Sequence, residues 1–178
     1  LVVSLDPTYT VSPNFGLNTN WTDTVTGARP FGSKDFRYGF SYAFDYKTFI
    51  DTVINGAAIQ GVGPIPPGMF GYNEDLVKSL QFSYNPEKAK EYFLSAKSAG
   101  AYSDGQTITL YYNTGNEVRR RGCLLLKDTI EGLGVGLSIE VQELDWPTFL
   151  AKMRAKELPV FFIGWAPDFA DPDDYVPV

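Results

Sequence analysis

The sequence predicts an α/β fold centred on a β-α-β-α-β unit, because strand-like and helix-like patterns alternate over residues 106–164. The three strand segments are short and rich in apolar or β-branched residues, whereas the two segments between them repeat apolar residues every three or four positions. With 178 residues, of which 44% are hydrophobic, the chain can bury a core of its own. It is therefore expected to form one domain, or a large part of one.

Two consecutive helices are expected early in the chain. Ser33 can cap a helix that runs to Phe44, because its side chain can accept a hydrogen bond from a free amide of the first turn. Asp45 can cap a second helix over residues 46–54 in the same way.

A proline- and glycine-rich stretch, residues 61–71, interrupts this helical part. Three prolines and three glycines fall within eight of its residues, which rules out a regular helix or a central strand. Beyond it, Asn85 followed by Pro86 is a strong helix start, and Gly100 is the expected stop.

The β-α-β-α-β unit places a set of polar and aromatic residues at one edge. Its expected elements are a strand at 107–112, a helix at 116–133, a strand at 137–141, a helix at 146–156 and a strand at 159–163. Parallel strands of such units gather ligands at their carboxyl ends. The residues expected at that rim are Asn113, Thr114, Asn116, Glu143, Trp165 and Asp168.

The last strand opens into a loop suited to binding. Trp165, Asp168, Phe169 and Asp171 follow the apolar run within a few residues, with prolines between them. A large aromatic side chain beside acids suits a small cationic or hydroxylated ligand. The sequence therefore predicts a ligand contact at this loop.

The whole chain, 1–178, is expected to be a single partial domain. Its segments are an extended lead-in (1–32), a helical part (33–100) with the Pro/Gly loop (61–71), the β-α-β-α-β core (106–164) and a ligand loop (165–178). The chain begins on a strand-like Leu1, and no apolar segment reaches the roughly 18 to 20 residues that span a bilayer. The sequence is therefore interpreted as a piece of a longer protein whose targeting signal lies elsewhere.

Composition disfavours several classes of function. The 15 basic and 21 acidic residues give a net charge of −6, whereas binding to nucleic acid depends on clustered Lys and Arg. The basic run Arg119–Arg121 lies in a helical pattern and is interpreted as a solvated face. The absence of His excludes His-based catalytic triads, and a single Cys123 provides no disulfide framework. No catalytic residue, cofactor or metal site is predicted.

An ordered set of residues resembles a known family. The set comprises Arg37, Ala43, Asp45, Gly56, residues 64–67 and 84–90, Gly100, Gly164, Trp165, Asp168, Asp171 and Pro172. In this order the chain, from about Tyr9 to Pro172, resembles the family 5 extracellular solute-binding proteins. These are the peptide, dipeptide and oligopeptide receptors of ABC importers.

The resemblance implies a fold, a location and a set of partners. Members are two-lobed proteins of the periplasmic-binding-protein type (type II), and this chain would be most of the second large lobe. It implies a non-catalytic monomer, periplasmic or extracellular and anchored at the cell surface, that delivers peptides to the transmembrane subunits of a permease. Asp168 matches the family aspartate that pairs with the free α-amino group of a peptide, a charge-assisted contact.

Several alternatives remain open at this level. Asp168 can instead form an Asx-turn, Asn113 and Asn116 can serve the N-terminus of the following helix, and Trp165 can simply close the sheet. Residues 158–165 contain no Lys or Arg to hold a peptide carboxylate. An oligosaccharide stacked on Trp165 is therefore an alternative ligand.

Two further alternatives change the class of the protein. Asp168 with Asp171 or Glu143 can be interpreted as the carboxylate pair of a glycoside hydrolase. However, nothing in the sequence indicates that the pKa of one acid is raised while the other acid stays ionised. The chain can also be a ligand-sensing lobe fused to an intracellular regulator.

Overall fold

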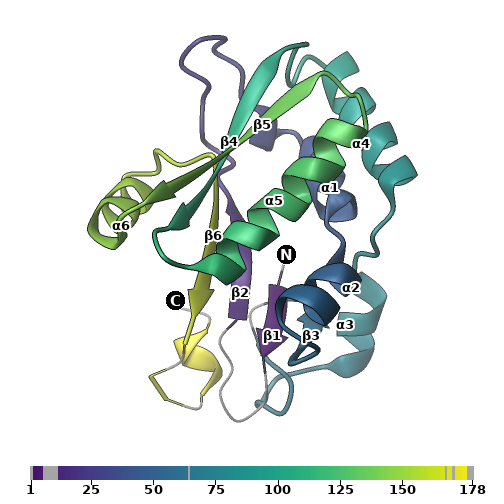
Figure 1. Cartoon of the computed structure of the whole chain (residues 1–178). Helices are drawn as coiled ribbons and strands as arrows, with labels where there is room; N and C mark the ends of the chain where they lie inside the picture. Colours follow the sequence, from purple (N-terminus) through teal and green to yellow (C-terminus); the bar gives the residue numbers. More distant parts are fainter. Residues whose placement is uncertain (1, 6–11, 64, 167, 170, 176–178) are drawn as a thin grey trace.

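The computed structural model describes residues 2–5, 12–63, 65–166, 168–169 and 171–175 (Figure 1). The family-pattern positions Tyr9 and Pro64, and part of the expected ligand loop, lie outside the described residues. None of the helices in the described ranges combines the length and apolar character that a membrane span needs.

A six-stranded mixed sheet forms the centre of the molecule, in the order β3-β1-β2-β6-β4-β5. Its strands are β1 (Val2–Leu5), β2 (Ser12–Leu17), β3 (Ala58–Gly61), β4 (Gln106–Asn113), β5 (Leu137–Leu144) and β6 (Val160–Trp165). Strand β4 pairs in parallel with both β5 and β6, whereas β2 joins β6 in an antiparallel manner. The β-α-β-α-β prediction is confirmed, and β4 is its central strand.

Helices pack around this sheet (Figure 1). They are α1 (Lys34–Ala43), α2 (Tyr46–Thr48), α3 (Glu74–Leu80), α4 (Pro86–Ser98), α5 (Glu117–Gly132) and α6 (Trp146–Arg154). Helices α2 and α3 lie beside β3 at the lower right of Figure 1. The short helical turns are η1 (Pro30–Gly32), η2 (Phe49–Val53, a π-helix) and η3 (Pro172–Asp174).

The predicted helices begin directly after the capping residues that the sequence indicated. Ser33 Oγ accepts from the amide of Phe36 at 3.3 Å, and Asp45 Oδ1 accepts from that of Thr48 at 2.9 Å. Asn85, Asn116 and Asp145 cap α4, α5 and α6 in the same manner. These caps satisfy amides that have no partner inside the helix, so they locate each helix start.

Two segments differ from the prediction. The helix expected over residues 46–54 changes register after α2, because η2 continues it as a π-turn. Helix α3 was not expected, although Asn73 caps it by accepting from the amide of Leu76 at 2.9 Å. None of its residues is buried, so the apolar periodicity that reveals buried helices is weak there.

The two faces of the sheet are covered by different helices. Phe162 stacks on Phe15 at 4.2 Å between ring centroids and packs beside Phe49, on the face that α5 crosses (Figure 1). Phe161 points to the opposite face, where Phe149 of α6 meets it edge-on at 6.2 Å. Helices α5 and α6 therefore lie on opposite faces.

Gly122 allows α5 to approach the sheet closely. A Cβ atom built on Gly122 would lie 2.3 Å from the ring of Phe162 and 3.0 Å from that of Phe49. Glycine in a helix interior destabilises the helix by about 1 kcal/mol relative to alanine. Here the absence of a side chain lets the rings pack directly against the helix backbone.

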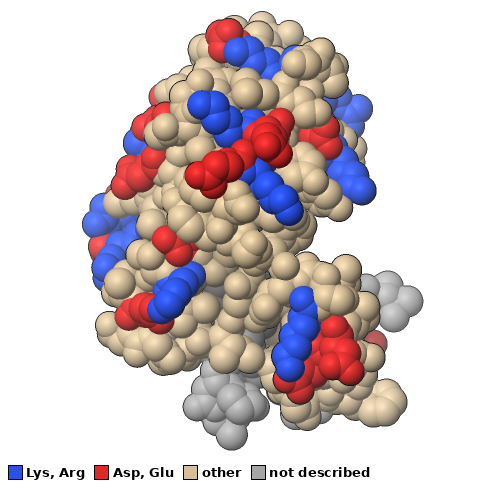
Figure 2. All heavy atoms as spheres, turned by 90° about the vertical axis from the view of Figure 1, so that its right-hand side faces the viewer, with Lys and Arg blue, Asp and Glu red and all other residues tan. Residues whose placement is uncertain are grey.

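Charged side chains of both signs are mixed on the face that carries α3 and α4 (Figure 2). Figure 2 shows Lys and Arg interspersed with Asp and Glu on this face, and neither sign forms a large patch. Pairs such as Lys78 with Glu74 at 2.7 Å are exposed. This surface has none of the clustered positive charge that nucleic-acid binding needs.

Candidate functional site

The carboxyl ends of β4, β5 and β6 meet at one edge, as predicted. Asn113 is opposite Leu144 in the parallel pair β4–β5, and Tyr111 is opposite Phe161 in the pair β4–β6. Counting two residues along each strand places Asn113 level with Ile163, so Trp165 extends past the end of β4. Glu143 is opposite Tyr112 and lies at the same edge.

The loop after β6 is held by hydrogen bonds within itself. Asp174 Oδ2 accepts from the indole Nε1 of Trp165 and from the backbone amide of Asp168, both at 3.0 Å. Asp171 Oδ1 caps η3 by accepting from the amide of Asp173 at 3.0 Å. In Figure 1 this loop continues from the lower end of β6.

The carboxylate of Asp168 differs from those of Asp171 and Asp174. Asp168 is exposed, and its carboxylate makes no hydrogen bond or ion pair with any residue in the described ranges. The Asx-turn that the sequence left open for Asp168 is formed by Asp171 instead. Trp165 and Phe169 next to it are 48% and 54% exposed, so aromatic surface adjoins an available acid.

Asn113 and Asn116 both serve the start of α5. Asn116 Oδ1 accepts from the amide of Arg119 at 3.0 Å, which is the capping alternative. Asn113 Oδ1 accepts from Arg119 Nη1 at 2.6 Å. Their amide oxygens are thus engaged inside the chain, while the Nδ2 of Asn113 makes a 3.5 Å contact with the carbonyl of Thr114.

The basic run does not form a uniform solvated face, so that interpretation was wrong for Arg119. Arg119 is half-buried, and burial lowers the pKa of its guanidinium. Arg120 pairs with Glu117 through two contacts of 2.7 Å, and Arg121 donates to the carbonyl of Thr52 at 3.3 Å. Sequence reasoning missed that the first turn of α5 brings Arg119 to the end of β4.

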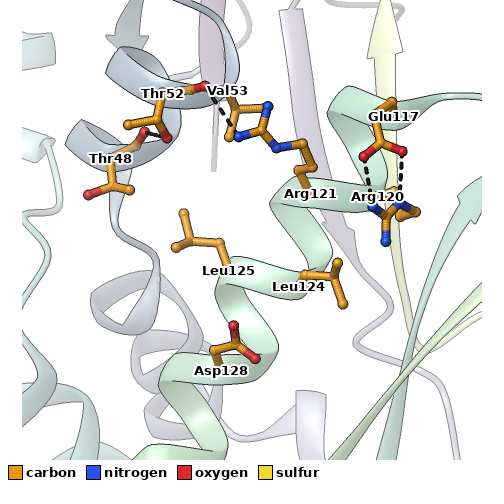
Figure 3. A pocket seen from close by; sticks show the side chains of 9 residues that line it. All are labelled: Thr48, Thr52, Val53, Glu117, Arg120, Arg121, Leu124, Leu125 and Asp128. Atoms are coloured by element: carbon orange, nitrogen blue, oxygen red, sulfur yellow. Dashed lines mark hydrogen bonds and ion pairs between the residues drawn. The ribbon is translucent and has the colours of Figure 1, made fainter.

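A pocket of about 320 Å³ lies between η2 and α5 and contains none of the predicted ligand contacts. Figure 3 shows Arg121 reaching across to Thr52, with Leu124, Leu125 and Asp128 further along α5. Arg121 links α5 to η2 by donating to the carbonyl of Thr52, whereas Arg120 pairs with Glu117 inside α5. This pocket is therefore distinct from the predicted site.

No reactive thiol is present in the described part of the chain. Cys123 is fully buried in α5, and burial raises the pKa of its thiol, so it stays protonated. The described residues also contain no group of three or more Cys, Asp or Glu side chains that could hold a metal ion.

The sequence matches a family model over residues 3–178, and that model describes the bacterial extracellular solute-binding proteins, family 5 Middle. The chain belongs to this family. The predicted resemblance is thereby confirmed over almost the whole chain. The family comprises extracellular or periplasmic binding proteins rather than enzymes.

Named relatives of this solute-binding protein have different ligands. It is 26% identical to the heme-binding protein A of Haemophilus influenzae over 172 residues, which is 96% of this chain and 30% of the relative. It is also 26% identical to the dipeptide-binding protein of Escherichia coli over 161 residues, 90% of this chain and 29% of the relative. The chain thus spans less than a third of the length of these relatives.

Solved structures share the fold of this solute-binding protein. A periplasmic binding protein from Helicobacter pylori, solved with the peptide STSA, superposes with a TM-score of 0.75 at 23% identity, covering 98% of this chain and 29% of that one. HbpA2 from Haemophilus parasuis gives a TM-score of 0.74 at 22% identity, covering 96% and 32%. The predicted periplasmic-binding-protein fold is confirmed.

Proposed function

We propose that this chain is one lobe of a receptor that captures short peptides outside the cytoplasm and delivers them to the transmembrane subunits of an ABC permease. The observation that carries the proposal is the carboxylate of Asp168, exposed and unengaged by the described residues, beside the exposed rings of Trp165 and Phe169. Membership of the solute-binding family supports it. Asp168 would receive the α-ammonium group of the peptide.

The physical basis is a charge-assisted hydrogen bond that strengthens when the site closes. Such a bond contributes roughly 1.5 to 3 kcal/mol, and excluding water increases its strength. A second lobe closing by a hinge would provide the enclosure, with backbone-like polar contacts that tolerate different side chains. Half of the site would then lie on this chain.

The role is one of binding, not of catalysis. A carboxylate pair needs two acids available to the substrate, yet Asp171 Oδ1 is engaged in capping η3. Glu143 lies on a different element, strand β5, and not in the loop that carries Asp168. The family also comprises binding proteins. We further propose that the receptor acts as a monomer, either periplasmic or anchored at the cell surface.

An oligosaccharide is the second candidate ligand, favoured by the exposed ring of Trp165 as a stacking surface. Strand β6 contains no basic residue, which removes one means of holding a peptide carboxylate. However, half-buried Arg119 brings a positive charge to the same edge of the sheet. This favours a ligand that has both an ammonium and a carboxylate group.

A pair of matched ligands tests the proposal. The complete receptor should bind tri-alanine more tightly than Nα-acetyl-tri-alanine, by about 10- to 150-fold, because acetylation removes the charge that Asp168 would receive. Isothermal titration calorimetry measures both affinities. Equal affinities would contradict the role of Asp168. A receptor that binds oligosaccharides but not tri-alanine would favour the second candidate.

A further inference from the structure

Two hydrogen bonds in the loop after β6 converge on one oxygen atom. Asp174 Oδ2 accepts from Trp165 Nε1 and from the amide of Asp168, each at 3.0 Å. The donors lie nine and six residues before Asp174, so one carboxylate joins the end of the strand to the middle of the loop.

The position of Asp174 is itself supported. Its amide donates to the carbonyl of Asp171 at 3.2 Å, within the turn η3. Asp171 caps that turn through the amide of Asp173, and Pro172 occupies its first position. The turn therefore holds the carboxylate of Asp174 toward Trp165 and Asp168.

These contacts define which groups of Trp165 and Asp168 are available to a ligand. An indole has a single N–H donor, and Trp165 uses it on Asp174, so only the ring of Trp165 is available. The backbone amide of Asp168 is engaged, whereas its carboxylate is bonded to none of the described residues. The ring and the carboxylate are thus presented together.

We propose that Asp174 is the positioning residue of the ligand site, which holds the ring of Trp165 and the carboxylate of Asp168 in their binding arrangement before the ligand arrives. The inference rests on the proposed function of these two residues. Trp165 and Phe169 are about half exposed, so burial does little to fix the part of the loop before Asp174, whereas Tyr175 after it is buried. Without Asp174, binding a ligand would also have to order the loop, and that ordering weakens affinity.

Three variants of the complete receptor test the role of Asp174. Asp174→Ala removes the acceptor, Asp174→Asn keeps an acceptor oxygen but removes the charge, and Asp173→Asn removes a neighbouring charge as a control. With tri-alanine in calorimetry, we expect about tenfold weaker binding for Asp174→Ala and changes below about threefold for the other two. Wild-type affinity in Asp174→Ala would overturn the proposal. Losses of about tenfold in both Asp174→Asn and Asp173→Asn would also overturn it, because they would indicate a long-range charge effect.

A measurement without ligand separates this inference from the proposed function. In ¹H–¹⁵N NMR, the indole proton of Trp165 and the amide proton of Asp168 should exchange slowly in the wild type and in Asp174→Asn. Both should exchange quickly in Asp174→Ala, while the amides of β4 and β6 keep their protection. If tri-alanine does not bind the wild type, the peptide proposal fails and exchange still decides the role of Asp174. Unchanged exchange in Asp174→Ala would overturn that role.

Discussion

Replacing Asp168 with Asn should weaken peptide binding by roughly 30-fold to several thousand-fold, which corresponds to about 2 to 5 kcal/mol. The loss is large because an ammonium enclosed next to a neutral amide is left without its counter-charge. The fold should be unaffected, since the carboxylate of Asp168 makes no bond to the described residues and is exposed. Calorimetric titration of the complete receptor with tri-alanine measures the effect.

Asp173→Asn is the matched control for Asp168→Asn. It removes the same charge from the same loop, at a side chain that is also exposed. Its affinity for tri-alanine should remain close to that of the wild type. An Asp168→Asn variant that binds as tightly as this control would show that Asp168 does not receive the amino group.

Phe162→Ala should destabilise the fold more than any change in the ligand loop, by about 3 to 5 kcal/mol. Phe162 is fully buried, stacks on Phe15 and fills the space that Gly122 leaves beside α5. Truncation would leave a cavity between β6 and α5, because ring and helix backbone are in direct contact. Chemical denaturation followed by circular dichroism measures the change in the free energy of unfolding.

The control for Phe162→Ala is Phe70→Ala. Phe70 is 89% exposed, so its truncation should change the free energy of unfolding by no more than about 0.5 kcal/mol. If the two variants are equally stable, the packing of α5 on β6 does not determine the stability of the fold.

The sequence predicted the parts of the fold whose signals are local. A side-chain cap marks the start of each predicted helix, as with Asn85 before α4 and Asn116 before α5. Strands β4 and β6 were recognisable because they are rich in apolar or β-branched residues. The helices between the parallel strands were recognisable because apolar residues recur in them every three or four positions. Their carboxyl ends then placed Asn113 and Trp165 at one edge by topology alone.

Other features depend on pairing between distant residues and have weak local signals. Strand β2 contains Pro13 and Gly16, which have low strand propensity, yet it pairs with β6 along its whole length. The ring of Phe161 occupies the space above Gly16, so this glycine serves packing across strands. Residues 12–17 themselves show neither the pairing with β6 nor the packing of Phe161 over Gly16.

The candidate site was predictable in outline and not in its internal contacts. Asp168 and Trp165 follow from the loop after the last strand, together with the family pattern. The contact between Asp174 and Trp165 was not predictable, because the sequence does not show which of the neighbouring acids folds back onto Trp165. Arg119 was hidden in a basic run whose three members have three different partners.

Peptide capture is tested most directly by mass spectrometry of the molecules released when the complete receptor, purified in its native state, is denatured. Closed binding proteins can retain ligand through purification, because release requires the two lobes to open. We predict a series of short peptides with free amino termini, in amounts close to that of the protein. Stoichiometric oligosaccharide, or any other ligand without a free amino group, would contradict it.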